Sequence, residues 1–320
     1  CGGCLSGPAL RMLRELLGPA RMPPGMTSQR ITFVIGAQRL TCDPKGAAWI
    51  ALRSELDACL AAEAARAGAH VRFGQAAKLE RRSNGWEVFV GDERITARTV
   101  LVATGTSGLM RSIGIEGRTE RRPMIAQQWF QLATERMPKS GEVELHWLRG
   151  GYVGLATSNG ALCNVALACD AKAAKQKNAF QYLRMLNPEA TIWSVLPSDA
   201  PQRFDAKAAA GFPWIPRRLG DANLLLIGDA AGYAEPFTGE GIAQAMHSAL
   251  CASRAVMQGG AVLRNYSTML QGRHQWVRWR TRMIGNILRT PLVHALATRR
   301  HILPSAWLAR LVGHVHGMGT

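Results

Sequence analysis

The chain has 320 residues, 47% of them hydrophobic, and carries 39 lysines and arginines against 22 aspartates and glutamates. This length and composition exclude a disordered polymer and predict two domains or one large discontinuous domain. The net charge of +17 favours anionic partners such as nucleic acid, acidic lipid or a phosphorylated cofactor, without choosing among them.

Seven cysteines at irregular spacing do not form the pattern of a secreted disulfide framework. No run approaches the roughly 18 consecutive apolar residues of a membrane-spanning helix. The first residues also lack the basic and apolar regions of a signal peptide. We therefore expect a cytoplasmic protein that is soluble or in peripheral contact with a membrane.

The first part of the chain predicts helices and short strands. An amphipathic run covers residues 9–17, and helical spacing of apolar residues covers 49–67 before Gly68. Short β-like segments follow, with an Asn-Gly turn between two of them. These predicted strands are 70–74, 77–81, 86–90, 94–97 and 99–103. A helix that leads into such strands is typical of α/β organisation.

The middle of the chain has longer strand patterns without helices between them. Residues 142–148, 152–156 and 162–168 are predicted as longer strands with glycines at the turns between them, which favours an antiparallel sheet. A helix is predicted over 170–186. The proline-rich stretch 212–216 is stiff and extended, and we interpret it as a crossing between domains.

The most informative segment joins a wholly apolar strand at 224–227 to a helix that begins near Glu240. Asp229 falls at the carboxyl end of the strand, where open α/β sheets place ligands, and its carboxylate can accept hydrogen bonds from sugar hydroxyls. Gly239 and Gly241 let the backbone approach a ligand closely. The helix start offers unpaired N–H groups to an anion.

This segment resembles the second flavin-binding motif of the para-hydroxybenzoate hydroxylase and geranylgeranyl reductase superfamily. The resemblance implies that Asp229 binds the ribityl chain of FAD and that Pro236 lies near the isoalloxazine. It places Gly239 and Gly241 beside the flavin pyrimidine and the pyrophosphate. Three neighbours within the motif are further candidates for cofactor binding: Gly228, Glu240 and Ile242.

The first residues, Cys-Gly-Gly-Cys-Leu-Ser, resemble a stretch that lies beside the flavin ring in geranylgeranyl reductases. Cys1, Gly2 and Gly3 are therefore candidates for the substrate side, and Cys4 replaces the last glycine of that stretch. A lone Cys-x-x-Cys is also compatible with a redox pair or half of a metal site. Without a second pair or nearby histidines, we predict no metal.

Other segments resemble the same family. Arg53, four residues before Asp57, matches an arginine that reaches the cofactor phosphates, although a solvated helix arginine is the alternative. Thr104 and Gly105 end a strand in an Ala-Thr-Gly pattern common in FAD proteins. Because aromatic hydroxylases carry an aspartate where Thr104 stands, this residue counts against an NADPH-driven hydroxylase. Ala77 completes the predicted cofactor-binding set.

Residues 150–155 and 164–167 resemble the substrate-domain strands that face the flavin in reductases and halogenases, with plain sheet as the alternative. Tyr152 and Gly154 are the candidates there. His146, in a β pattern, is interpreted as a packed core histidine, and no catalytic acid or base is assigned.

The resemblance implies an α/β fold: a Rossmann-like FAD domain with an inserted antiparallel substrate domain and a helical tail. We predict residues 1–110 and 218–260 for the FAD domain, 111–217 for the substrate domain and 261–320 for a basic tail. The chain contains no Gly-x-Gly-x-x-Gly and opens at Cys1 in a glycine-rich turn. We therefore expect an N-terminal truncation of about one βαβ unit, roughly 30 residues or more.

The expected function is FAD-dependent reduction of a double bond in an apolar polyprenyl or polyketide substrate, with NADPH or another electron donor. A flavin monooxygenase is the alternative within the superfamily. From another class, a non-catalytic binder of membranes or nucleic acid would use Trp276 and Trp279 among arginines. The tail favours an acidic membrane surface over nucleic acid, with a solvated helical face as the third interpretation.

Overall fold

The computed structural model describes most of the chain. The described residues are 3–28, 30–42, 48–83, 85–105, 109–119, 123–132, 138, 141–157, 162–170, 178–205, 208–210, 214–221, 223–232, 237, 239–288 and 290. Cys1, Gly2, Pro236 and the predicted tail beyond 290 lie outside them. Within the described part, none of the helices combines the length and hydrophobicity that crossing a bilayer requires.

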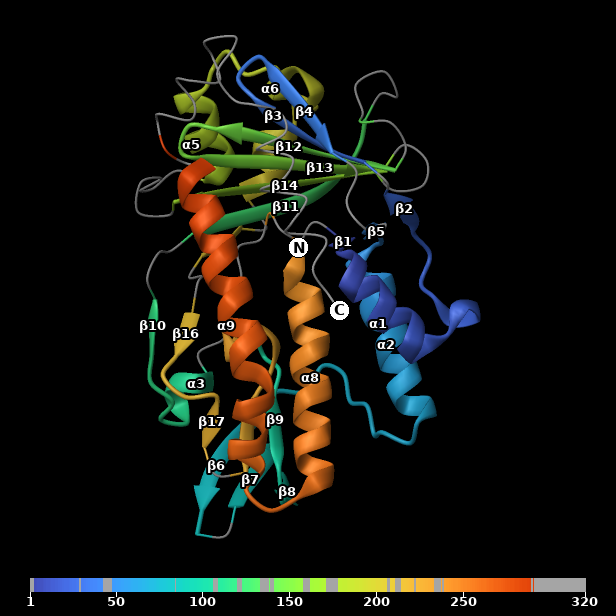
Figure 1. Cartoon of the computed structure of the whole chain (residues 1–320), viewed down its shortest axis with the longest axis vertical. Coiled ribbons are helices and arrows are strands. Elements are labelled where there is room, and N and C mark those ends of the chain that lie inside the picture. Colours follow the sequence, from blue (N-terminus) through green and yellow to red (C-terminus); the bar gives the residue numbers. More distant parts are fainter. Residues whose placement is uncertain are drawn as a thin grey trace.

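The N-terminal region is a small antiparallel sheet with two helices beside it (Figure 1). Its strands are β1 (Cys4–Leu5), β5 (Ala48–Ile50) and β2 (Met26–Ser28), in the order β1-β5-β2. The helices are α1 (Gly7–Leu17) and α2 (Arg53–Arg66), and the short η1 covers Pro19–Arg21. The prediction of a helix from residue 49 was wrong at its start, because 48–50 pair with two strands and bury Ile50 completely.

The second unit is built on two parallel strands, β9 (Val100–Val102) and β18 (Leu224–Leu226), with β17 (Gly220–Asp221) antiparallel at one edge. All three leucines of β18 are fully buried, as the apolar run predicts. The short α3 covers Leu109–Ser112. Two long helices, α8 (Glu240–Gln258) and α9 (Val262–Leu288), lie side by side against these strands (Figure 1).

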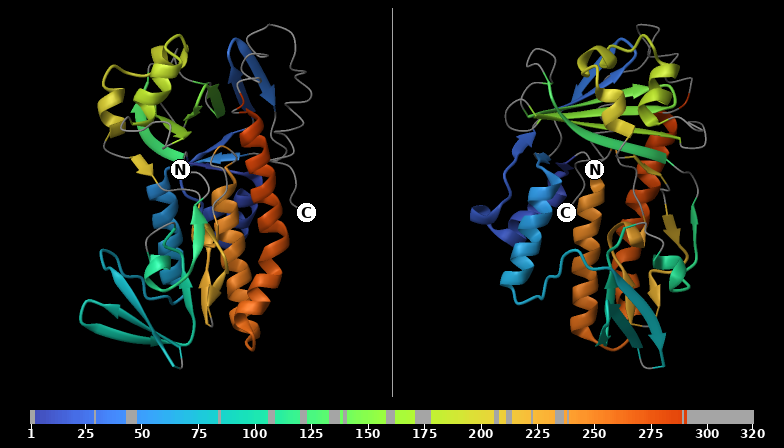
Figure 2. Two further views of the ribbon diagram at one scale, coloured as in Figure 1. Left: turned by 90° about the vertical axis from the view of Figure 1, so that its left-hand side faces the viewer. Right: turned by 180° about the vertical axis from the view of Figure 1, so that it is seen from behind.

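A separate antiparallel sheet contains β6 (Ala77–Arg82), β7 (Gly85–Val90) and β8 (Glu93–Ala97). It lies at the end of the molecule opposite the largest sheet (Figures 1 and 2). These strands were predicted, but residues 70–74 form no strand and are exposed. Their alternation is too short to bury a face, so no core holds them in a sheet.

The largest sheet has seven strands in the order β15-β11-β14-β13-β12-β3-β4. Its strands are β3 (Arg30–Ile35), β4 (Gln38–Cys42), β11 (Pro123–Gln131), β12 (Glu142–Leu148), β13 (Gly151–Thr157), β14 (Leu162–Asp170) and β15 (Ala208–Ala210). The three central predicted strands are confirmed as antiparallel neighbours. Residues 30–42, placed with the first unit in the prediction, add β3 parallel to β12. A small pair joins β10 (Gly117–Thr119) to β16 (Trp214–Pro216).

The two faces of this sheet carry different neighbours. Val153 and Leu155 of β13 point to a core shared with three helices. These helices are α5 (Ala179–Leu186), α6 (Ile192–Val195) and α7 (Ala200–Asp205). Tyr152 and Ala156 point to the other face. There they pack with Phe237, which precedes α8, and with Ile284 of α9. The second face is therefore the one that meets the cofactor motif.

Candidate functional site

Two sequence motifs meet at one edge of the β9–β18 pair. Thr104 and Gly105 follow β9, while Gly228 and Asp229 follow β18 in a short 3₁₀ turn, η3 (Gly228–Ala231). The two strands are parallel, and the Ile227 N–H donates to the Val102 carbonyl at 3.0 Å. Their carboxyl ends therefore lie at the same edge, as a ligand site of an open α/β sheet requires.

Small residues hold η3 against α8. A Cβ on Gly228, whose φ is +61°, would lie 3.5 Å from the Cβ of Ala245. The Gly228 N–H donates to Ser248 Oγ at 2.9 Å, and Ser248 is fully buried. This contact fixes the carboxyl end of β18 relative to the helix that follows it.

Asp229 is a partly buried carboxylate beside this contact. Burial raises its pKa, and the positive charge of Arg53 partly opposes that rise. Arg53 begins α2 and also pairs with Asp57 at 2.9 Å. Within the described residues, no side chain donates a hydrogen bond to the Asp229 carboxylate. A desolvated acceptor of this kind fits a ligand that brings its own hydroxyl donors.

The start of α8 is open on one side and packed on the other. Gly239 adopts φ 64° and ψ 10°, the left-handed conformation that glycine favours. A Cβ there would lie 3.4 Å from the Cys4 carbonyl oxygen, so the predicted ring-side segment touches the helix start. Gly241 has no atom within 4 Å of an added Cβ, and Ile242 follows it in the first turn. The first N–H groups of α8 can therefore receive an anion such as a diphosphate.

The predicted substrate side lies on the adjoining face of the large sheet. Gly3, with φ +67°, accepts a hydrogen bond from the Ala51 N–H at 2.9 Å and lies beside the ring of Trp129. Tyr152 packs on Trp147 and Phe237, with ring centroids 5.2 and 6.2 Å away. Phe237 lies two residues before Gly239, so these aromatic rings connect the sheet to the motif loop.

Gly154 lies on the same face of β13 as Tyr152, two residues further along the strand, and its added Cβ would contact Leu145 at 3.2 Å. Ala77 begins β6 and is exposed, in a sheet separate from the motif strands. Its role in cofactor binding stays a prediction.

The Cys4 thiol and the His146 ring, both considered in the sequence analysis, lie in buried surroundings. Burial raises the pKa of the Cys4 thiol to about 12, so it stays protonated at neutral pH. His146 is buried and bonds Glu144 at 3.0 Å, which agrees with the packed-core interpretation. No group of three or more metal-ligating side chains occurs in the part of the chain that the structure describes.

Residues of α9 that sequence reasoning missed also reach the motif loop. A Cβ on Gly232 would lie 2.4 Å from a guanidinium nitrogen of Arg278, so this arginine packs on the loop. The buried His274 faces the backbone of Ala231 and Gly232. The prediction treated 261–320 as a tail. The available signal was the spacing of Tyr266, Leu270, His274 and Val277, which places them on one buried helix face.

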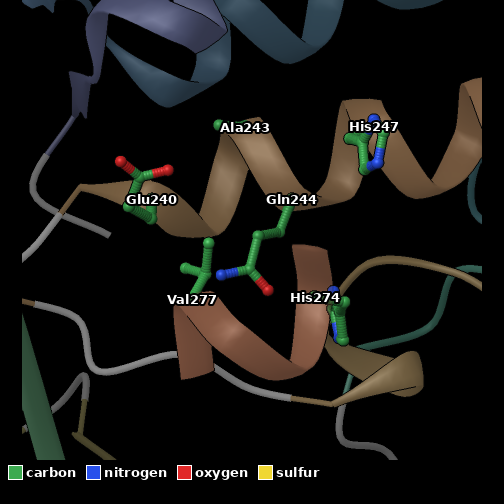
Figure 3. Close-up of a pocket in the computed structure, with 6 residues that line it drawn as sticks. All are labelled: Glu240, Ala243, Gln244, His247, His274 and Val277. Carbon is green, nitrogen blue, oxygen red and sulfur yellow. The ribbon is translucent and has the colours of Figure 1, made fainter. Parts of the chain in front are cut away.

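A small pocket lies between α8 and α9 (Figure 3), lined by Glu240, Ala243, Gln244, His247, His274 and Val277. Gln244 points from α8 toward His274 and Val277 of α9 (Figure 3). Both amide atoms of Gln244 are buried without a partner among the described residues. The pocket begins at the first turn of α8 and therefore adjoins the site.

The His274 environment predicts a pH dependence of stability. Burial, with Arg278 and His247 nearby, lowers its pKa from 6.5 to about 4. Between these values the unfolded chain binds more protons, so the free energy of unfolding should decrease as pH falls from 6.5 towards 4, by up to about 3 kcal/mol. Denaturant titrations at several pH values measure this decrease. H274Q should flatten the dependence, whereas the exposed-site control H70Q should keep it; identical curves for all three proteins would contradict the assignment.

No protein-family model matches the chain. Digeranylgeranylglycerophospholipid reductase 2 of Methanosphaera stadtmanae is 28% identical over 261 residues, which cover 77% of this chain and 62% of that protein. A digeranylgeranylglycerophospholipid reductase of Methanocaldococcus jannaschii is 28% identical over 218 residues, 65% of this chain and 54% of that protein. The chain therefore spans less than two thirds of the length of these relatives.

Several solved flavoproteins share the fold. A flavoprotein/dehydrogenase of Cytophaga hutchinsonii has a TM-score of 0.75 at 14% identity and covers 99% of this chain and 83% of its own. HpxO of Klebsiella pneumoniae, solved with FAD and uric acid, has a TM-score of 0.69 at 14% identity, with coverage of 98% and 86%. A geranylgeranyl bacteriochlorophyll reductase-like protein of Thermoplasma acidophilum has a TM-score of 0.68 at 17% identity. The match covers 99% of this chain and 82% of that protein. The predicted resemblance and the α/β flavoprotein fold are confirmed.

Proposed function

We propose that the protein is an FAD-dependent oxidoreductase that reduces a carbon–carbon double bond of an apolar polyprenyl or polyketide substrate. The observation that carries this proposal is the convergence of Asp229, the start of α8 and the Gly3–Cys4 segment at one edge of the parallel strands. The sequence similarity to digeranylgeranylglycerophospholipid reductases favours a polyprenyl substrate over a polyketide.

The residues at this edge fit FAD. Asp229 would accept hydrogen bonds from the ribityl hydroxyls, and the N–H groups that open α8 would face the diphosphate. Arg53, whose charge already acts on Asp229, would add a positive charge on the same side. A side chain at Gly239 would be strained by the φ of +64° and would occupy space beside the helix start, in contact with the Cys4 carbonyl oxygen. When bound, FAD supplies hydride chemistry that these side chains lack.

The chain supplies the apolar surroundings of the reaction. Tyr152, Trp147 and Phe237 form a buried aromatic cluster between the large sheet and the motif loop. Such a cluster can pack against an aliphatic chain and exclude water from it. Thr104, where the hydroxylases carry an aspartate, supports the reductase over the monooxygenase.

The proposed location is the cytoplasm, with peripheral membrane contact through the basic C-terminal region. The irregular cysteine spacing supports a reducing compartment. A lipid-like substrate would itself reside in a membrane.

Product mass tests the proposal. The protein, expressed from its complete coding sequence and loaded with FAD, is reduced with dithionite and given a detergent-dispersed polyprenyl lipid or, in a separate assay, an unsaturated polyketide. Each assay is run without oxygen and repeated with oxygen. We expect products heavier by about 2 Da per reduced double bond, from one hydride and one proton. A gain of about 16 Da per turnover, seen only with oxygen, would instead identify a monooxygenase. A reduced flavin that changes neither lipid nor polyketide mass would overturn both activities.

A further inference from the structure

Helix α9 exposes an apolar surface on one side. Trp276, Trp279 and Met283 retain 45%, 62% and 37% of their exposure to solvent. Their spacing of three and four residues places them on one face of the helix. We call these three residues the tryptophan face. The adjoining side of α9 buries Val277 and Ile284 in the protein core.

The tryptophan face lies in the most basic part of the chain. Residues 241–320 contain ten arginines and no aspartate or glutamate, so they carry ten of the seventeen net positive charges. Arg282 is exposed on α9 beside Trp279. The Arg280 guanidinium lies 4.5 Å from the centre of the Trp276 ring. Arg280 itself is buried, so an anionic surface would meet the two indole rings together with the exposed Arg282. Residues 241–320 have no acidic side chain that would repel it.

These features fit a bilayer surface better than a nucleic acid. Indole rings with an apolar body and a polar N–H partition to the membrane–water interface. Each arginine near an acidic leaflet contributes further attraction. Base stacking would need open ring faces, but Arg280 covers one face of Trp276. Met283 adds an apolar chain that suits lipid tails and offers no stacking surface.

We propose that the tryptophan face docks the protein on an anionic lipid bilayer. Ile284, on the buried side of the same helix, packs in the cluster that contains Tyr152 and Phe237. Docking would therefore bring the proposed substrate side to within about one helix diameter, roughly 10 Å, of the lipid. The inference rests on the proposed function for its purpose, because a lipid substrate would then have a short route to the site.

Vesicle sedimentation tests the docking without substrate. We expect binding to phosphatidylcholine vesicles that contain phosphatidylglycerol, much weaker binding to phosphatidylcholine alone, and a blue shift of tryptophan fluorescence. The double variant W276A/W279A should lose at least about tenfold in vesicle affinity. M257A, at an 86% exposed position on α8, is the matched control and should bind as the parent does. Thermal unfolding of each protein shows whether the fold is retained.

Three results would overturn the docking: equal binding to both kinds of vesicle, unchanged binding by a folded double variant, or binding to single-stranded DNA that outcompetes the anionic vesicles. The experiments distinguish a failure of the docking proposal from a failure of the proposed activity. Loss of vesicle binding with unchanged activity on detergent-dispersed lipid supports docking by this face alone. Vesicle binding through this face in a protein that reduces no double bond leaves the docking intact and removes the proposed function.

Discussion

Replacing Asp229 with alanine is expected to weaken FAD binding roughly 10- to 100-fold, the loss that follows when hydrogen bonds to a charged acceptor are removed. The carboxylate is partly buried, and no described side chain donates a hydrogen bond to it, so the ligand would provide the compensating donors. Titration of the apoprotein with FAD, followed by flavin fluorescence, measures the change. D229N retains a carbonyl acceptor without the charge, so its FAD affinity should lie between that of D229A and that of the parent.

The same substitution should not destabilise the protein without its cofactor. Burial raises the pKa of Asp229, so the folded state binds a proton more readily than the unfolded state does. The charged carboxylate at neutral pH therefore opposes folding, and its removal should leave the free energy of unfolding unchanged or higher. A loss of stability in D229A would show that Asp229 serves the fold rather than a ligand.

Asp221 provides a matched control in the same sheet. It is more deeply buried than Asp229, and Arg81 and Arg218 bond one of its carboxylate oxygens at 2.7 and 3.2 Å. D221N should therefore lower the free energy of unfolding by about 1 to 3 kcal/mol while FAD affinity stays near that of the parent. The opposite responses of the two aspartates would separate a ligand-binding carboxylate from a structural one.

The parts of the site that the sequence predicts are those encoded within short segments. The apolar strand 224–226, the turn at Gly228 and the helix start at Glu240 occupy one continuous stretch, and local propensity determines each of them. The antiparallel strands from Glu142 onward were predictable for the same reason, since the strand segments and the turn glycines between them are adjacent in sequence.

The missed parts depend on pairing between distant segments. Strand β3 aligns with β12, more than 100 residues further along the chain, and no local pattern in residues 30–35 specifies that partner. Residues 48–50 have helical spacing, but pairing with β1 and β2 outweighs it. His274 and Arg278 reach the motif loop only because α9 packs beside α8, which a basic composition does not indicate.

Among the described glycines with a positive φ, Gly3 is the one whose added Cβ would come closest to a backbone atom, and we expect a large cost of substitution there. A Cβ there would lie 2.4 Å from the Ala51 backbone oxygen, and φ is +67°, which side chains rarely adopt. Neither constraint can relax without moving the Gly3–Cys4 segment away from β5. G3A should therefore lower the free energy of unfolding by about 3 kcal/mol or more and weaken FAD binding, because Cys4 borders the Gly239 helix start.

Gly74 separates the two causes of this cost. Its φ is +70°, but an added Cβ would meet nothing within 4 Å, so G74A carries the backbone strain without the clash. We expect G74A to lose about 1 kcal/mol in a denaturant titration and to bind FAD as the parent does. If G3A is no less stable than G74A, the contact with Ala51 does not constrain the segment. The placement of the substrate side beside the helix start would then lose its structural basis.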